Sequence, residues 1–283
     1  MTSSGNPTLR QQRLGLELRK LRESAGLTST AAAARVGVNQ AHMSRIEAGR
    51  YPVSAERVRA FARAYTCSDQ GLIEALAGMT GRRVRGWWQE YRDILPPNML
   101  DLAETEHHST AMRIASVIHI PGLLQTADYV RALADNSVPP LAPHEVEHRV
   151  SYRIKRQVVV YGQQAIPLTA IVHEAALRMG VGGPAAARAQ LRHLIEASTR
   201  ENISVLVIPF GAGTLPGSGQ SIVYCSAIVP QLDTVQLDTY HGSEFLDAQA
   251  QLVKYQKVLD LMEACALDPV KSRDLIARIG KDI

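Results

Sequence analysis

The stretch LTSTAAAARVGVNQAHMSRIE, residues 27–47, decides the fold of the amino-terminal part of this chain. It predicts two short helices, one from Thr28 to Val36 and one from Gln40 to Ala48. Gly37 stands where the chain must reverse, because glycine accepts the left-handed backbone conformation that such a turn needs. Asn39 is placed to cap the second helix. The stretch is therefore a helical hairpin with a tight turn.

The second predicted helix has two different faces. Met43 and Ile46 are three residues apart and share the face that packs inward. The opposite face carries short or hydrogen-bonding side chains, namely Gln40, Ala41, Ser44 and Arg45. A helix in the DNA major groove needs such residues, since Gln can pair with adenine, Arg with guanine, and Ala can contact a thymine methyl group. The pattern favours DNA reading by this helix.

The hairpin resembles the lambda-repressor-like (Cro and repressor, or XRE) helix-turn-helix family over roughly Leu14 to Leu76. The residues that carry the resemblance are Leu27, Thr28, Ala33, Gly37, Val38, Met43, Ser44, Arg45, Ile46, Glu47 and Gly49. The chain departs from the family at Ser29, where a Gln often contacts a phosphate, and at Ala32, where Leu is usual. The predicted DNA-contacting residues are Thr28, Ser29, Asn39, Gln40, Ala41, His42, Ser44, Arg45 and Arg50.

The flanking sequence predicts three more helices around the hairpin. Leu14, Leu18 and Leu21 recur at helical spacing in residues 11–24, and Ser54 and Asp69 are placed to cap two later helices. We expect a five-helix DNA-binding bundle over residues 11–78. A flexible arm over 1–10 precedes it, and a Gly- and Arg-rich linker over 79–86 follows it.

Charge and composition limit the class of protein. Residues 1–85 contain 14 Lys and Arg against 6 Asp and Glu, a net charge of +8, whereas the whole chain has +4. A basic amino-terminal part attracts the phosphate backbone. Because the sequence contains neither a signal peptide nor a long apolar run, we expect a cytoplasmic protein without membrane contact. Three widely spaced cysteines argue against both a disulfide framework and a Cys-based metal site.

The part from residue 87 to 283 predicts a mixed α/β domain, so the fold class of the chain is α+β. Trp87 and Trp88 suggest a short helix with buried aromatic rings. The expected strands are 112–120, 168–173, 203–210, 221–227 and 234–240. The expected helices are 121–134, 143–159, 184–199, 247–266 and 268–280. The apolar run ISVLVIPF, residues 203–210, predicts the buried centre of a sheet.

This second part is similar to the carboxyl-terminal domain of WhiJ-like regulators of actinobacteria, from about Gly86 to Ile279. The motifs that carry the similarity are WWxxY at 87–91, PGLLQT at 121–126, RxxxRxxRQ at 149–157, GGP at 182–184 and PFxAG at 209–213. The resemblance implies a transcription regulator, usually paired with a small companion protein that is encoded nearby in an antitoxin-like arrangement. It implies no catalytic mechanism.

A search for catalytic or metal-binding patterns gives no match. His173 and Glu174 begin like a zinc-protease motif, but Leu177 replaces the second histidine. The Gly-rich segment 211–219 follows a strand but has no Lys-Ser or Lys-Thr end, so we interpret it as a hairpin loop rather than a phosphate loop. We therefore expect no enzyme activity, no metal and no cofactor.

Three arginines form the most suggestive set in the second domain. Arg149, Arg153 and Arg156 are spaced to form one stripe of a helix. Such a stripe could clamp an acidic partner surface or a phosphorylated ligand. A solvated face with ion pairs to Glu145 or Glu147 is the other interpretation.

These observations favour a sequence-specific regulator that binds double-stranded DNA. We expect it to act as a homodimer, because two half-sites multiply specificity. Its carboxyl-terminal domain would respond to a small companion protein or a ligand. An enzyme with an appended DNA-binding module and a protein-interaction module without specific DNA binding are the alternatives.

Overall fold

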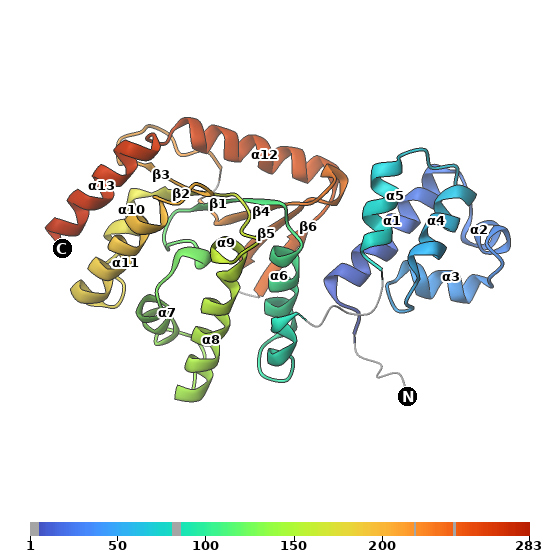
Figure 1. Cartoon of the computed structure of the whole chain (residues 1–283), viewed down its shortest axis with the longest axis horizontal. Coiled ribbons are helices and arrows are strands. Elements are labelled where there is room, and N and C mark those ends of the chain that lie inside the picture. Colours follow the sequence, from blue (N-terminus) through green and yellow to red (C-terminus); the bar gives the residue numbers. More distant parts are fainter. Residues whose placement is uncertain (1–5, 81–85, 218, 240–241) are drawn as a thin grey trace. The chain divides into compact units, whose positions relative to one another are not determined.

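The computed structural model describes residues 6–80, 86–217, 219–239 and 242–283 of the chain. These residues form two compact units, which divide in sequence between Gln89 and Glu90. The first unit is helical and the second combines a sheet with helices (Figure 1), so the predicted α+β class is confirmed. Among the described residues, no helix combines the length and the apolar character that a membrane crossing requires.

The amino-terminal unit contains the five predicted helices. They are α1 (Leu9–Ser24), α2 (Ser29–Arg35), α3 (Gln40–Glu47), α4 (Ala55–Ala64) and α5 (Gln70–Gly78). Each begins after a side chain that accepts a hydrogen bond from the first turn, and these caps are Thr8, Thr28, Asn39, Ser54 and Asp69. Because each cap satisfies a backbone N–H group that the helix leaves free, the start of each helix is fixed by local sequence.

The two predicted flexible segments are only partly described. Residues 1–5 of the arm and 81–85 of the linker lie outside the described residues. The described end of the arm is short, because α1 begins at Leu9 instead of Gln11. Thr8 and Gln11 form a reciprocal capping box that fixes this earlier start.

The carboxyl-terminal unit is built on one six-stranded sheet. Its strands are β1 (Ala111–Ser116), β2 (Leu168–His173), β3 (Ile203–Ile208), β4 (Ile222–Ser226), β5 (Thr234–Thr239) and β6 (Gly242–Leu246). They lie in the order β3-β2-β1-β4-β5-β6, with β1, β2 and β3 parallel to one another and the other pairings antiparallel.

The remaining helices of the chain lie between or beside the strands in sequence. They are η1 (Trp87–Tyr91), α6 (Pro97–His107), η2 (Gly122–Leu124), α7 (Ala127–Ala134), α8 (Pro143–Arg156), α9 (Val158–Tyr161), α10 (Glu174–Arg178), α11 (Gly183–Ala197), η3 (Pro230–Leu232), α12 (Gln249–Ala264) and α13 (Pro269–Asp282). The short helix predicted at Trp87 and Trp88 is η1, and Trp88 is buried. Helix α12 lies on the face of the sheet opposite to α11 (Figure 1).

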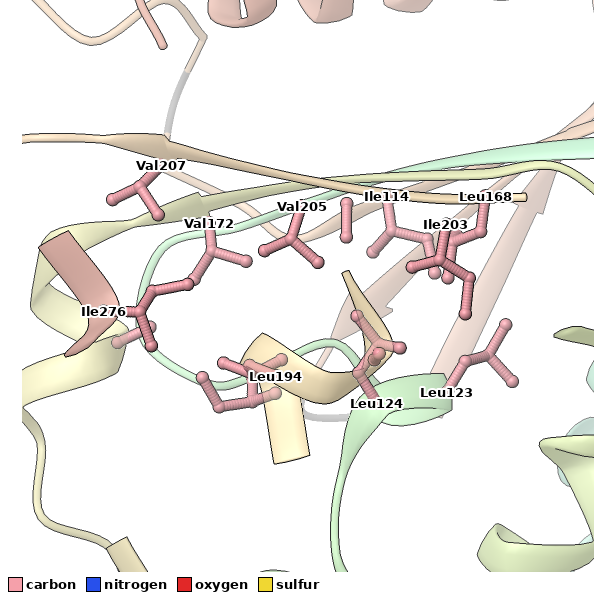
Figure 2. Packing of buried hydrophobic residues seen from close by; sticks show 14 of the residues in the cluster. Ile114, Leu123, Leu124, Leu168, Val172, Leu194, Ile203, Val205, Val207 and Ile276 are labelled. Atoms are coloured by element: carbon pink, nitrogen blue, oxygen red, sulfur yellow. The ribbon is translucent and has the colours of Figure 1, made fainter. Parts of the chain in front are cut away.

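Alternating strand residues supply two cores, one on each face of the sheet. Ile114, Val172 and Val205 point into the first core, where Leu194 of α11 and Ile276 of α13 meet them (Figure 2). Neighbouring strand residues, such as Ala115 and Ile171, point into the second core against α12. Since successive side chains of a strand point to opposite faces, both sets must be apolar when both faces are covered.

The position predicted for the third strand is wrong. β3 is an edge strand, not the centre of the sheet. Its continuous apolar sequence reflects helices on both faces, because burial by helices and burial between strands give the same pattern. The outer edge of β3 is covered by the start of α13 and by the segment before it. The N–H of Val207 donates to Ser272 Oγ of α13 at 2.9 Å, and the N–H of Leu267, between α12 and α13, donates to the carbonyl of Val207 at 2.8 Å.

Other predicted boundaries also need correction. The first strand ends at Ser116 instead of residue 120. The helix predicted over 121–134 is divided, because Thr126 caps a separate α7 after η2. Helices α6 and α10 and strand β6 were not predicted. The segment 211–219 is not a hairpin loop, since β3 and β4 are not neighbours in the sheet.

Candidate nucleic-acid interface

Helix α3 is held by the turn and the cap that the sequence predicts. Gly37 has φ of +69°, and the N–H of Val38 donates to the carbonyl of Ala33 at 2.9 Å, which closes the end of α2. Asn39 Oδ1 accepts a hydrogen bond from the N–H of His42 at 2.8 Å. These local bonds fix the direction in which α3 leaves the turn.

The inner face of α3 is locked into the bundle. Met43 and Ile46 are each 1% exposed. Helix α1 lies so close to α3 at Gly15 that a Cβ at this position would be 2.5 Å from the carbonyl oxygen of Glu47. The hydroxyl of Tyr65 donates to Met43 Sδ at 3.7 Å, and burial, followed by the charge of Glu47, raises the pKa of Tyr65 to about 12. The rotation of α3 about its own axis is therefore set by packing.

The outer face of α3 is open to solvent. Its exposed residues are Gln40, Ala41, Ser44 and Arg45. Asn39 and Arg50, just before and just after α3, are exposed as well. Within the described residues, the guanidinium groups of Arg45 and Arg50 form neither an ion pair nor a hydrogen bond. These donors are therefore available to an external acceptor.

The paired arginines of the same unit behave differently. Arg22 is bound to Glu47, and Arg59 is bound to Glu74 with Nη2 2.6 Å from Oε2. Several of the basic groups that contribute to the net charge are therefore paired with carboxylates. The guanidinium donors of Arg45 and Arg50, in contrast, are unpaired within the described residues. This difference separates cations that stabilise the bundle from those that can bind phosphate or a base edge.

Ser29 and His42 are less exposed than residues that contact DNA directly would be. Both side chains are partly buried. Ser29 Oγ and His42 Nε2 are enclosed by protein atoms, and neither has a hydrogen-bond partner among the described residues. The His42 ring packs on Tyr51, with ring centroids 4.1 Å apart. In this arrangement the enclosed atoms cannot contact DNA directly, because they do not reach the surface.

Thr28 acts as a helix cap. Its Oγ1 accepts a hydrogen bond from the N–H of Ala31 at 3.1 Å. Thr28 is exposed at the surface near the start of α2.

The sequence analysis did not single out Tyr51, which is 45% exposed and packs against His42. An aromatic residue directly after Arg50 was the available signal.

The three arginines of α8 do not form one solvated stripe. Arg156 is only 7% exposed and forms an ion pair with Glu106 of α6. Arg153 is partly buried, and its Nη1 donates to Gln125 Oε1 at 2.8 Å. Arg149 is also partly buried. The interpretation as a solvated face therefore needs correction, because Arg156 is buried and its carboxylate partner is Glu106, not Glu145 or Glu147. The interpretation as a clamp for an acidic partner or a phosphorylated ligand stays a prediction.

His173 and Glu174, which begin like a zinc-protease motif, have hydrogen-bond partners within the second unit. No group of three or more His, Cys, Asp or Glu that could hold a metal ion occurs in the described parts of the chain. His173 Nδ1 accepts a hydrogen bond from the N–H of Ala175 at 3.2 Å, so it caps α10. Glu174 binds Arg178 and accepts from the N–H of Phe210 at 2.8 Å. The His173 and Glu174 pair thus connects the ends of β2 and β3.

Comparison with known protein families divides the chain in the same order. Residues 13–76 match the family described as a helix-turn-helix domain. Residues 99–278, more than half of the chain, match the family described as a domain of unknown function, DUF5753. No curated protein and no solved structure matches the chain significantly.

Proposed function

The chain belongs to the DUF5753 family, and because its residues 13–76 match a helix-turn-helix domain, we propose that it is a sequence-specific DNA-binding regulator of transcription. The observation that carries the proposal is the outer face of α3, where four exposed side chains stand on a helix whose inner face is fixed by Met43 and Ile46. A helix that reads DNA must have an exposed outer face and a fixed orientation, because its hydrogen bonds to base edges depend on its rotation and on its depth in the groove.

Each residue of this face has a distinct role in the proposal. Arg45 donates two hydrogen bonds to a guanine edge, and Gln40 pairs with an adenine edge. Ala41 contacts a thymine methyl group, and Ser44 binds either a base edge or a phosphate. Arg50, which follows the helix, binds the phosphate backbone. Asn39 and Thr28 position the helix ends through their caps, and they contact the backbone through exposed atoms.

The proposal gives Ser29 and His42 supporting roles. Both were predicted to contact DNA, but Ser29 Oγ and His42 Nε2 are enclosed. His42 instead holds the Tyr51 ring beside the exposed face of α3. Tyr51 would extend the contact along the backbone, because its hydroxyl can donate to a phosphate oxygen.

We propose a dimer as the active form. One reading helix contacts only a few base pairs, so two copies on half-sites about one helical turn apart would supply the specificity that a regulator needs. The carboxyl-terminal unit, which is the larger of the two, would join the subunits and respond to a small companion protein or ligand. The similarity to WhiJ-like regulators, which includes the motifs at 121–126 and 149–157, supports a role of the carboxyl-terminal unit in this response.

Selection from a random duplex library tests the DNA-binding proposal, because such a library requires no assumed operator sequence. We expect the full-length protein to enrich one motif, arranged as two related half-sites. A footprint of the enriched duplex should cover both half-sites, and light scattering of the complex should give two protein chains per duplex. Enrichment of no motif would remove sequence-specific binding from the proposal. A motif bound by one chain would remove the dimer alone.

A further inference from the structure

The contact between α8 and η2 brings two guanidinium groups together over one glycine. Arg156 binds Glu106 side-on, with Nε 2.8 Å from Oε2 and Nη2 2.5 Å from Oε1. This geometry uses one edge of the guanidinium and leaves Nη1 on the other side. Arg156 Nη1 has no hydrogen-bond partner among the described residues, and it is not sealed from solvent.

Gly122 lies where the two arginines converge. A Cβ placed on Gly122 would lie 3.5 Å from Nη1 of Arg153 and 3.5 Å from Nη1 of Arg156. One small group beside the Gly122 backbone could therefore contact both guanidinium groups at once. A side chain at residue 122 would occupy this point, whereas glycine places no side-chain atom between the two Nη1 atoms.

The charges around this point are not balanced. Glu106 compensates Arg156, and although burial opposes the charge, this carboxylate raises the pKa of Arg156 overall. Arg153 has no carboxylate within ion-pair distance among the residues that the structure describes. Burial and the neighbouring charge of Arg156 lower the pKa of Arg153 to about 10. A partly buried cation without a counter-ion is costly, and an anion would offset that cost.

The groups around Arg153 hold it in place without neutralising it. Gln125 is buried, and its Nε2 donates to the carbonyl of Ile120 at 2.7 Å, so that Oε1 is turned toward Arg153. Asp238 favours the charged form of Arg153 from a distance, but its Oδ1 accepts from Gln236 Nε2 at 2.7 Å. His119 lies near Arg153, and partial burial, followed by the charge of Arg153, lowers the pKa of His119.

We propose that Arg153, Arg156 and Gly122 form a binding site for an oxyanion, either a carboxylate or a phosphate group of a small ligand. One oxygen of the anion accepts hydrogen bonds from Nη1 of both arginines beside Gly122, and a second oxygen accepts from the free edge of Arg153. Guanidinium groups suit this task, since they offer several donors in a fixed plane and stay charged. That this site controls DNA binding rests on the proposed function, whereas the binding itself does not.

Thermal unfolding of the full-length protein with added anion tests the site in the absence of DNA. Inorganic phosphate and sodium acetate are titrated separately, with sodium chloride added to keep the ionic strength constant. We expect a saturable rise in the unfolding temperature with at least one of the two anions, because binding to the folded state alone stabilises it. The anion that saturates at lower concentration identifies the preferred group.

Three variants make the test specific. Arg153→Gln removes the uncompensated cation, and Gly122→Ala fills the space between the guanidinium groups while keeping both charges. We expect each to weaken the anion affinity roughly tenfold or more, the cost of losing a charge-assisted hydrogen bond. Arg149→Gln, one turn earlier on α8, is the matched control and should bind as the unchanged protein does. Circular dichroism checks that each variant is folded.

The outcomes separate the site from the regulatory role. Saturable shifts in the unchanged protein and in Arg149→Gln, but not in Arg153→Gln and Gly122→Ala, support the site. A shift that is equal in all four proteins, or that never saturates, overturns it. A parallel titration measures the affinity for the selected duplex with and without the anion. An affinity that changes only in the proteins that bind the anion supports control of DNA binding, and an unchanged affinity removes that role.

Discussion

Arg22 of α1 binds Glu47 at the end of α3 through two hydrogen bonds, with Nε 2.6 Å from Oε1 and Nη2 3.1 Å from Oε2. Both side chains are largely buried. Arg22 Nη1 also donates to the carbonyl of Leu27 at 2.7 Å, in the turn before α2. One guanidinium group therefore ties the last residue of α3 to α1 and to the turn before α2.

The Glu47→Gln substitution should destabilise the amino-terminal unit by roughly 2 kcal/mol, because Arg22 loses a charged acceptor in a largely buried position. Native-state hydrogen exchange of the α3 amides measures this effect separately from the carboxyl-terminal unit. Glu23→Gln is the control, since Glu23 also contacts Arg22 but is exposed, and it should cost clearly less stability than Glu47→Gln. Equal effects of the two substitutions would mean that the buried pair does not hold α3.

The Asn39→Ala substitution should cost about 1 kcal/mol of stability, because the N–H of His42 loses its cap. Asn39→Ser should restore most of that loss, since a serine hydroxyl can accept the same hydrogen bond. Urea unfolding followed by α3 hydrogen exchange measures both variants. A serine variant as unstable as the alanine variant would show that Asn39 does more than cap the helix.

The Ser272→Ala substitution should destabilise the carboxyl-terminal unit by about 1 to 3 kcal/mol. The reason is that Ser272 Oγ is the acceptor for the N–H of Val207 on the edge strand β3, and Ser272 is fully buried. Thr199→Ala is the control, because its hydroxyl bonds to the carbonyl of Glu196 at the exposed end of α11. Chemical unfolding should distinguish them, and similar stabilities would contradict the role given to Ser272 at the sheet edge.

The Arg50→Ala substitution should weaken binding to all duplexes and should lower the slope of log affinity against log salt by about 1. This follows if Arg50 neutralises one phosphate. Arg59→Ala should leave the slope unchanged, because Arg59 is already paired with Glu74. Fluorescence anisotropy at several salt concentrations gives both slopes. Identical slopes for Arg50→Ala and the unchanged protein would exclude this phosphate contact.

The amino-terminal helices could be predicted because their signals are local. Thr28, Asn39, Ser54 and Asp69 each cap a helix within three residues of their own position, and Gly37 allows the turn by itself. Apolar spacing then gave the inner face of α3. The sequence did not reveal that Ser29 Oγ and His42 Nε2 would be enclosed, because that depends on packing between helices.

The carboxyl-terminal unit was harder to predict because its contacts are distant in sequence. Arg156 and Glu106 are 50 residues apart, and neither reveals its partner. The apolar sequence of β3 predicts that the strand is buried, but it does not tell which strands pair with it. Its edge position follows from the strand order, and Ser272 bonds to that edge from a distant part of the chain. Helix α6 was missed although Pro97 stands at its first position, where proline favours a helix start.

The central claim is that α3 reads base edges, and the direct measurement compares specific with unrelated DNA. Anisotropy titrations of the selected duplex and of a duplex of unrelated sequence are made with the unchanged protein, with Gln40→Ala, with Arg45→Ala and with the double variant. We expect each single substitution to cost about 1 to 3 kcal/mol for the selected duplex and much less for the unrelated one. Unchanged discrimination between the two duplexes in the double variant would contradict the account.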